Sequence, residues 1–575
     1  MRNERRFAGV AIPTWLLAAS FPLAAVAAIP PPIIGPTVNI GEQGVASAEP
    51  LVPVPPVTPC VVQLFTADSP TGTFDDYSAH GFTYTPPAGC TGPWNKVVFK
   101  ADYNVTAGRQ FDRTASVWIG GVNIYFGTTQ EPRSTVSPSW HVERDVTDLS
   151  NALTSAQPGN AVLYNIFNDT YNGSITGSAE LDFYPATPDY PAATVPDQVL
   201  SLSSDPAGNT FSINTDGAPF SRTFTLPANI ERAYLDVIAE AQSGDEFWYT
   251  CGPDSISDLT GCGGSGFREA QISIDGQPAG FAPISPWIYT GGIDPYLWRP
   301  IPGVQTLDFK PFRVDLTPFA AMLDNGQPHT VAVSVVTGDP DFVNNSQRFD
   351  TAATLLLYQD AGSVQVTGGF LGAPHDSGVH PVNTLTSSNG GQNYDINVTS
   401  VHTFNARGYV NTSHGRVTSL ASESAAFGNH DLLTNSATFE QNINLVSSVV
   451  STSTRIDRNG TSNRSRNWSF PLRLDYKFIS NPDGSFTQAT TVDQLHHDHH
   501  AAHAAGALPY SDSLDYHDQA ADTLLFDSNF NVTGHNGQRA SQSYLYRNSI
   551  GQCYSRSIAA ADGAVTTVND GAGCP

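Results

Sequence analysis

Residues 96–105 read Lys96-Val-Val-Phe-Lys-Ala-Asp-Tyr-Asn-Val105, and their alternation decides the fold class. Every second residue from Val97 to Val105 is apolar or aromatic, whereas Lys96, Lys100 and Asp102 lie on the opposite face of an extended chain. Such alternation is typical of a half-buried β-strand. Similar patterns occur at 233–240, 270–274 and 331–336. We therefore expect an all-β protein.

The composition of the 575-residue chain agrees with this fold class. Only 14% of the residues are charged, and there are 49 glycines and 42 prolines, which fits β-sheet better than a helix bundle. The length predicts roughly two to four domains. The net charge of −26 argues against nucleic acid as a partner, because phosphate binding needs basic faces.

The first 28 residues have the pattern of a signal peptide. A basic start, from Arg2 to Arg6, precedes an apolar stretch that ends in small residues. An uncleaved membrane anchor is the alternative, but the prolines in the stretch favour cleavage. No later apolar run is long enough to span a bilayer. We therefore expect a secreted or periplasmic protein without membrane contact after cleavage.

The six cysteines fall into three local pairs, which are 30, 11 and 21 residues apart. An even number of cysteines in an exported chain suggests disulfides, and no C-x-x-C motif points to metal. The sequence alone does not fix the connectivity, but we expect neighbours to pair. The expected pairs are Cys60 with Cys90, Cys251 with Cys262, and Cys553 with Cys574.

An internal repeat divides the middle of the chain. The segment 113–119 is similar to 268–274, and 145–149 is similar to 315–319, which indicates two tandem domains of one β-fold. The second copy holds 15 more residues between these landmarks, and we place them in the aromatic segment 287–299. Aromatic loop residues can stack on sugar rings. The alternative is a loop that folds back over its own core.

We expect the chain to contain five consecutive regions. They are a signal peptide at 1–28, a proline-rich linker at 29–59, two antiparallel jelly-roll (β-sandwich) domains at 60–192 and 193–361, and a β-rich C-terminal domain at 362–575.

The local signals of serine hydrolases, zincins and nucleotide-binding proteins are missing from the sequence, so the carboxylates in loops are the better candidates for chemistry. Asp112 lies between Arg109 and Arg113 at the start of an expected strand. Nearby arginines would keep this carboxylate ionised. A structural salt bridge is the alternative explanation.

Two further loops carry acidic residues. Asp245 and Glu246 precede three aromatic residues, and like charges beside apolar rings raise the pKa of one carboxyl group. Such a difference makes an acid and a base from similar groups. The alternative is an acidic loop anchored by a buried tryptophan. Glu131 is the third candidate.

A histidine-rich run extends from His496 to His503 and includes Asp498. These groups could bind a divalent metal. A solvated low-complexity loop is the simpler interpretation, because no supporting residues are recognisable around the run. We therefore expect neither metal nor cofactor.

Seven short motifs, taken in order, resemble the peptide:N-glycanase A family of glycoamidases, best over 60–360. The resemblance implies hydrolysis of the amide bond between N-acetylglucosamine and asparagine, without metal or cofactor. The glycan would leave intact and the asparagine would become aspartate, so the expected substrates are N-glycosylated peptides and proteins. The motifs are Val62-Gln-Leu-Phe-Thr66, Tyr84-Thr-Pro-Pro87, Gly108-Arg-Gln-Phe-Asp-Arg113, Glu131-Pro132, Gly244-Asp-Glu-Phe-Trp-Tyr249, Phe267-Arg-Glu269 and Gly291-Gly-Ile-Asp-Pro295.

The resemblance also implies roles for single residues. A distant flavobacterial relative carries its key aspartate in a Trp-Asp-Arg motif that opens a strand, and Phe111-Asp112-Arg113 is similar to it. This similarity implies that Asp112 is the primary catalytic carboxylate, which orients or deprotonates the attacking water. Arg113 would hold the substrate or position Asp112.

The second catalytic carboxylate is not implied so directly. In the relative, a glutamate comes shortly before a Phe-Arg pair, but no carboxylate precedes Phe267-Arg268 at the matching distance. Glu246 or Glu269 could supply the acid. We prefer Glu246, because its aromatic neighbours could raise its pKa and let it protonate the leaving group.

The remaining candidates would bind substrate in a cleft between the two domains. An acidic pH optimum and a monomeric state are further expectations. The alternative function is a non-catalytic glycan-binding jelly-roll protein, and a structural surface protein would bind no glycan at all. The substrate-binding candidates are Arg113, Glu131, Asp245, Trp248, Arg268, Tyr296 and Trp298.

Overall fold

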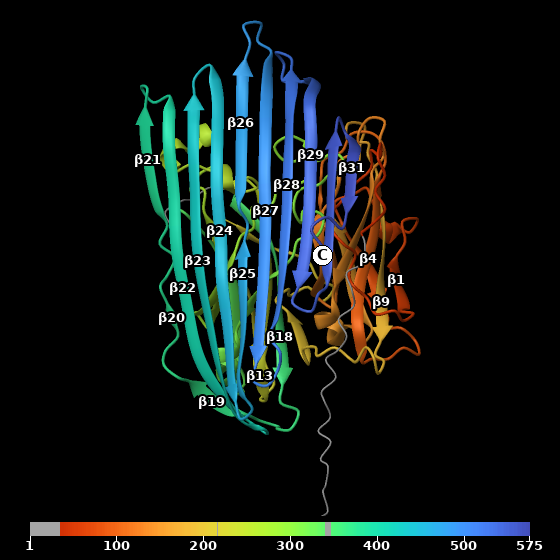
Figure 1. Ribbon diagram of the computed structural model, residues 1–575, viewed down its shortest axis with the longest axis vertical. Coiled ribbons are helices and arrows are strands. Elements are labelled where there is room, and N and C mark those ends of the chain that lie inside the picture. Colours follow the sequence, from red (N-terminus) through yellow and green to blue (C-terminus); the bar gives the residue numbers. More distant parts are fainter. Residues whose placement is uncertain (1–34, 215–216, 340–346, 575) are drawn as a thin grey trace, which may run out of the picture.

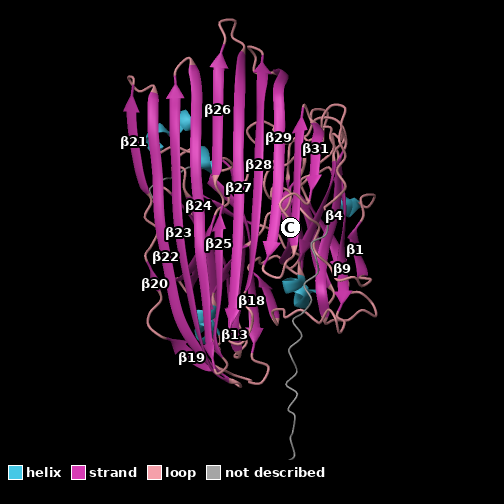
Figure 2. Ribbon diagram, in the orientation of Figure 1, coloured by secondary structure: helices cyan, strands magenta, loops and turns pink. Residues whose placement is uncertain are grey.

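The computed structural model describes residues 35–214, 217–339 and 347–574, and it is built almost entirely of antiparallel strands (Figures 1 and 2). The predicted all-β fold class is confirmed. The predicted signal peptide lies outside the described residues. Within the described ranges, no helix is long and apolar enough to cross a membrane. The short helices are η1 (Pro70–Gly72), η2 (Thr147–Leu153), η3 (Trp248–Thr250), η4 (Asp254–Ile256), α1 (Ser257–Thr260), η5 (Thr317–Phe319) and α2 (Ala320–Leu323).

The first sandwich consists of two sheets, with strand orders β1-β9-β4-β7 and β3-β8-β5-β6, and β2 added beside β9. The alternating stretch that decides the fold class is β4, whose Val97 and Phe99 are fully buried against rings such as Tyr125 of the opposite sheet. The strands are β1 (Cys60–Phe65), β2 (Thr73–Phe74), β3 (Ala79–Tyr84), β4 (Trp94–Val105), β5 (Thr114–Ile119), β6 (Val122–Thr128), β7 (Ser139–Asp145), β8 (Gln157–Leu163) and β9 (Ile175–Pro185).

The second sandwich repeats this arrangement strand by strand. Its sheets have the orders β10-β18-β13-β16 and β12-β17-β14-β15, with β11 beside β18, so each strand matches the one nine places earlier. This equivalence agrees with the internal repeat, and the crossings between sheets are compatible with the predicted jelly rolls. The strands are β10 (Gln198–Ser201), β11 (Phe211–Asn214), β12 (Phe220–Thr225), β13 (Ile230–Ser243), β14 (Arg268–Ile274), β15 (Gln277–Pro283), β16 (Phe312–Asp315), β17 (Pro328–Thr337) and β18 (Gln347–Gln359).

The extra residues of the second copy form the long β15–β16 loop, 284–311, as the sequence predicts. This loop is hydrogen-bonded to β6 of the first sandwich. The Phe309 amide donates to the Phe126 carbonyl at 2.8 Å, and the Thr128 amide donates to the Thr306 carbonyl at 2.8 Å. The loop therefore joins the two sandwiches instead of extending into solvent.

The C-terminal part of the chain forms one sheet of 13 strands, several of which are about 20 residues long. Figure 1 shows these green-to-blue strands side by side, with the orange first sandwich beyond β31. Phe427 of this sheet packs on Phe267 at 4.9 Å, and the sheet shares one apolar cluster with the second sandwich. The strands are β19 (Thr367–Phe370), β20 (His375–Asp376), β21 (Val382–Ser388), β22 (Asn393–Thr412), β23 (Gly415–Asn435), β24 (Thr438–Asp457), β25 (Gly460–Ser469), β26 (Leu472–Ser480), β27 (Phe486–Ala504), β28 (Tyr510–Phe526), β29 (Val532–Asn548), β30 (Cys553–Ala561) and β31 (Ala564–Asp570).

Cross-links and the N-terminal segment complete the fold. All three predicted disulfides are present: Cys60–Cys90, Cys251–Cys262 and Cys553–Cys574. The described part of the predicted linker is packed between the sheet and the first sandwich. The Gln542 side chain accepts the Ala48 amide at 2.7 Å, and Glu143 accepts the Val52 amide at 2.8 Å.

Candidate active site

A cavity of about 1070 Å³ lies where the two sandwiches and the C-terminal sheet meet. The first sandwich contributes the ends of β5 and β6, and the second contributes the end of β13 and the β15–β16 loop. The β28–β29 hairpin closes the remaining side. Of the predicted site residues, the cavity lining includes Asp112, Arg113, Glu131, Glu246 and Tyr296.

Asp112 lies in the loop that enters β5. Its carboxylate accepts the backbone N–H of Gly291, which belongs to the β15–β16 loop of the other sandwich. Burial raises the pKa of Asp112, while this hydrogen bond and the nearby Arg113 charge act in the opposite direction. The contact between the two repeats therefore passes directly through the predicted catalytic carboxylate.

Glu131 follows β6 and is buried beside Asp112. It accepts the guanidinium of Arg299 at 2.9 Å and a backbone N–H of Asp112. Burial, followed by the Asp112 charge, raises the pKa of Glu131 to about 8, although Arg299 opposes the shift. A side chain at position 291 would collide with both carboxylates, so the close approach of the loop requires Gly291. The charge on Asp112 therefore favours the protonated form of Glu131.

Glu246 comes after the end of β13 and points into the same cavity. Burial, followed by the charge of Asp112, raises its pKa to about 7. The sequence predicts a raised pKa for one of two adjacent carboxylates, but the repulsion comes from Asp112 and not from Asp245. Glu246 therefore combines a place beside Asp112 with a pKa suited to donating a proton near neutral pH.

Arg113 is held in position by two neutral partners. Its Nη2 donates to the Gln110 side chain at 3.0 Å, and its Nε donates to Asn165 at 3.2 Å. The structural salt bridge with Asp112, the alternative explanation from the sequence, is not among these contacts. The guanidinium lines the cavity with its charge close to Asp112.

Several predicted site residues lie outside the cavity. Asp245 and Arg268 form a buried ion pair at 2.6 Å, and Arg268 also donates to backbone carbonyls, including Ser265 at 2.6 Å. Glu269 is hydrogen-bonded to His402 at 2.7 Å, under the C-terminal sheet. These three residues are therefore buried with structural partners and are not part of the cavity lining.

The aromatic candidates also differ in whether they are buried or line the cavity. Trp248 and Trp298 are each 1% exposed, and the Trp298 indole donates to the Gly292 carbonyl at 3.0 Å. The alternative expectation, a loop folded over its own core, applies to Trp298, and neither indole offers a face to a sugar. Tyr296 does line the cavity, but its ring stacks on His535 at 3.8 Å and lies 4.8 Å from Arg299.

Comparison with known proteins places this architecture in a family. The sequence model described as peptide N-acetyl-beta-D-glucosaminyl asparaginase amidase A matches residues 70–369. The chain belongs to this family. The predicted family, and with it the predicted enzyme class, is thereby confirmed.

One curated relative, the peptide-N4-(N-acetyl-beta-glucosaminyl)asparagine amidase A of Prunus dulcis, is 29% identical over 440 residues, which are 71% of this chain and 73% of that protein. Among solved structures, PNGF-II aligns with a TM-score of 0.35 at 14% identity, covering 52% of this chain and 66% of that chain. PNGase F, a glycosylasparaginase from Flavobacterium meningosepticum, aligns with a TM-score of 0.35 at 16% identity, covering 52% and 96%.

Sequence reasoning missed part of the amidase A cavity. Arg299 and Arg133 line it, as do Phe530, Asn531 and Val532 of the β28–β29 hairpin, which lies beyond the matched residues. Arg299 closes the aromatic segment that the repeat comparison singled out, so its place could have been suspected. The hairpin carries no recognisable local signal.

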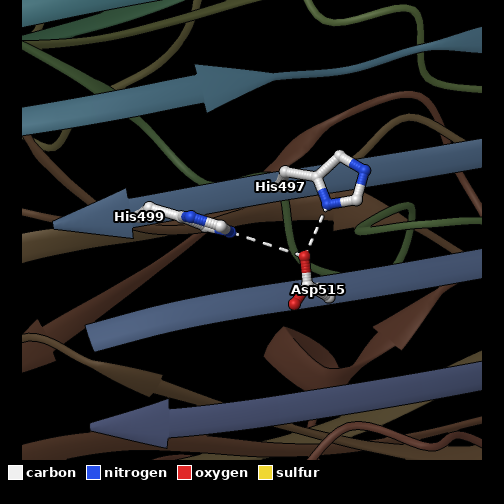
Figure 3. A group of neighbouring side chains, drawn as sticks. All are labelled: His497, His499 and Asp515. Atoms are coloured by element: carbon white, nitrogen blue, oxygen red, sulfur yellow. Dashed lines mark hydrogen bonds and ion pairs between the residues drawn. The ribbon is translucent and has the colours of Figure 1, made fainter. Parts of the chain in front are cut away.

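The histidine-rich run lies in β27, so the expectation of a low-complexity loop is wrong. His496 is buried on the inner face, whereas His497 and His499 share the outer face with Asp515 of β28 (Figure 3). Asp515 accepts from His497 at 2.6 Å and lies 3.4 Å from His499. The three groups could hold a metal ion, but they lie outside the cavity lining.

Two smaller cavities, of about 250 and 290 Å³, flank the N-terminal segment around Glu49 and Leu51. Neither is lined by Asp112, Glu131 or Glu246. The larger cavity between the three parts of the fold is therefore the better candidate for chemistry.

Proposed function

We propose that this chain hydrolyses the amide bond between N-acetylglucosamine and asparagine in N-glycosylated peptides and proteins. The intact glycan leaves as a glycosylamine, and asparagine becomes aspartate. Membership of the amidase A family supports this reaction. The observation that carries it here is the meeting of Asp112 and Glu246, one from each sandwich, in a single cavity.

In this proposal Asp112 acts as the general base. Burial raises the pKa of Asp112, but the Gly291 N–H and the Arg113 charge oppose this effect and favour its ionised form. Asp112 takes a proton from water as the water oxygen attacks the carbonyl carbon of the asparagine side chain. In this proposal the neighbouring side chains of Glu131 and Arg299 set the electrostatic environment of the Asp112 carboxylate.

Glu246 acts as the general acid. Its pKa of about 7 keeps it protonated under mildly acidic conditions. It donates this proton to the amide nitrogen as the carbon–nitrogen bond breaks, because the departing amine is otherwise a poor leaving group. The proposal predicts a rate that is highest below neutrality and falls as Glu246 ionises.

Substrate is held by polar groups around the carboxylates. Within the described ranges, the Arg113 guanidinium bonds to the neutral side chains of Gln110 and Asn165 and offers donors for sugar or peptide carbonyls, and Tyr296 also lines the cavity. The three disulfides support an oxidising compartment, in line with export from the cytoplasm.

The test is digestion of a defined glycopeptide, with the peptide and glycan products both identified by mass spectrometry. The proposal requires a free glycan that retains both core N-acetylglucosamine residues, and a peptide with aspartate in place of asparagine. If one N-acetylglucosamine stays on the peptide, the protein is an endoglycosidase. If no glycan is released between acidic and neutral pH, the amidase proposal fails.

The alternative function, a glycan-binding protein without activity, predicts a different result from one variant. Asp112→Asn should abolish turnover by an amidase while the glycopeptide still binds. For a pure binding protein, the same change would leave all measurable behaviour unaltered.

A further inference from the structure

The third wall of the cavity comes from a part of the chain outside the family match. Phe530, Asn531 and Val532 line it from the hairpin between β28 and β29, whereas the match ends at residue 369. The hydrogen bonds and charges that shift the pKa values of Asp112, Glu131 and Glu246 come from the two sandwiches. The hairpin is thus a separate wall of the cavity, contributed by the C-terminal sheet.

Phe530 offers the most open ring face in the described lining. Its side chain is 73% exposed, whereas Phe111 is 44% exposed and packs against Tyr171 at 5.2 Å. One side of the Phe530 ring contacts Phe486 at 4.8 Å, and Phe486 is itself stacked on Phe526 at 4.5 Å. The exposed ring is therefore braced from behind by a row of aromatic side chains.

The backbone at Phe530 is also unusual. Its φ is +64°, a conformation that suits glycine and that costs about 1 kcal/mol or more for other residues. The loop closes without help from the ring, because Asp527 accepts the amides of Asn529 at 2.8 Å and Asn531 at 3.0 Å. A glycine would adopt this φ at lower energy than phenylalanine. The turn therefore does not require phenylalanine, and the contacts of the ring explain this residue better than the backbone does.

The chemistry of this wall fits a sugar. A monosaccharide has apolar C–H faces that stack on aromatic rings and hydroxyl edges that bond to amides. The hairpin offers the Phe530 ring next to the side-chain carbonyl of Asn531, whose amide nitrogen donates to Asp527 at 3.0 Å. None of the three hairpin residues in the lining is charged. The cavity also exceeds the roughly 300–1,000 Å³ of ordinary small-ligand pockets, as an extended ligand requires.

We propose that Phe530 is a stacking platform for a sugar beyond the asparagine-linked N-acetylglucosamine, so that the C-terminal sheet makes the enzyme selective for extended glycans. This inference rests on the proposed amidase function. It assigns to the sheet a specificity-determining residue for that reaction.

The experiment compares kcat/KM on one peptide carrying either a single N-acetylglucosamine or a complete N-glycan core. Phe530→Gly should lower kcat/KM for the complete core roughly five- to ten-fold, as loss of one aromatic stacking contact does, and leave the single-sugar substrate unchanged. Phe530→Trp, which keeps an aromatic ring, should retain the wild-type preference for the complete core over the single sugar. Relief of the positive φ should offset the lost contact with Phe486, so the melting temperature should change little.

A matched control makes the same backbone change away from the cavity. Asn389→Gly, at φ +53° in the β21–β22 hairpin, should alter neither substrate. Equal losses of Phe530→Gly on both substrates, or no loss on either, would overturn the inference, and so would a loss that follows peptide length instead of glycan length. A wild-type protein that releases neither glycan contradicts the amidase proposal itself.

Discussion

The two sandwiches place an arginine at the entrance of equivalent strands, β5 and β14, yet the two arginines differ in exposure and in their bonding partners. Arg113 reaches the cavity and bonds to the neutral side chains of Gln110 and Asn165. Arg268 is fully buried and paired with Asp245. The same element of the repeat therefore lines a cavity in one copy and forms a buried ion pair in the other.

The difference follows from what covers each entrance. In the second sandwich, Phe427 of the C-terminal sheet packs on Phe267, and the Asn429 side chain donates to the Gly266 and Tyr249 carbonyls. In the first sandwich, the equivalent position of Phe267 is Asp112, which opens to the cavity. A covered entrance demands full pairing of its polar groups, whereas an open one leaves them available for substrate.

The largest effect should come from the open entrance. Asp112→Asn removes the proposed base and should lower kcat by about 10³-fold, within the usual range for general-base groups. Steady-state release of glycan from a glycopeptide measures this. The melting temperature should change little, and more than a tenth of the wild-type rate in the variant would contradict the role of Asp112.

At the covered entrance of β14, a substitution should lower the free energy of unfolding instead of the activity. Arg268→Ala leaves the buried Asp245 charge without its ion pair and should cost about 3–5 kcal/mol in the free energy of unfolding. Urea unfolding measures this cost. The matched variant Arg113→Ala should lose activity and cost less than about 1 kcal/mol, because its position is partly open. Equal stability losses at both sites would refute the contrast between the entrances.

The neighbours Asp245 and Glu246 sharpen the same contrast within two residues. Wild-type kcat should fall as pH rises through about 7, because Glu246 loses the proton it donates. Glu246→Gln should lower kcat by roughly 10²-fold and remove most of this alkaline limb. A pH–rate profile of both proteins tests whether Glu246 causes this fall in kcat. An unchanged alkaline limb in the variant would show that another group causes the fall.

Asp294 tests a covered carboxylate at the edge of the cavity. It is buried beside Asp522 and near Arg299, and burial raises its pKa to about 7. The unfolded chain ionises this group near pH 4, so its contribution is present below that pH and is lost as pH rises toward 7. Asp294→Asn should flatten this fall in the free energy of unfolding. Urea unfolding at several pH values measures the slope, and an unaltered slope would contradict the assignment.

The smallest effect should come from the outer face of the sheet. A chelator should leave glycan release unchanged, because His497, His499 and Asp515 lie outside the cavity lining. The rate is measured before and after prolonged dialysis against the chelator. A loss that added metal restores would show that a metal site takes part in the reaction or supports the fold.

The sequence determined the periodic and local features of this protein. Alternation in β4, the repeat and the place of the extra loop residues follow from short-range patterns, because strand geometry sets them. The pairing of neighbouring cysteines was an expectation that the three disulfides confirm. The ordered motifs also sufficed to indicate the family, and they pointed to Asp112, which lies in the cavity lining.

Only the tertiary structure decided which polar and aromatic residues face the cavity. Glu246 and Glu269 were comparable candidates in the sequence, but one lies beside Asp112 and the other is bonded to His402 beneath the sheet. Trp298 and Tyr296 are two residues apart, yet one is core and the other lining. Phe530 joins the cavity from more than 200 residues away. Whether a residue is buried or exposed depends on long-range contacts, because the residues that pack over it come from another part of the chain.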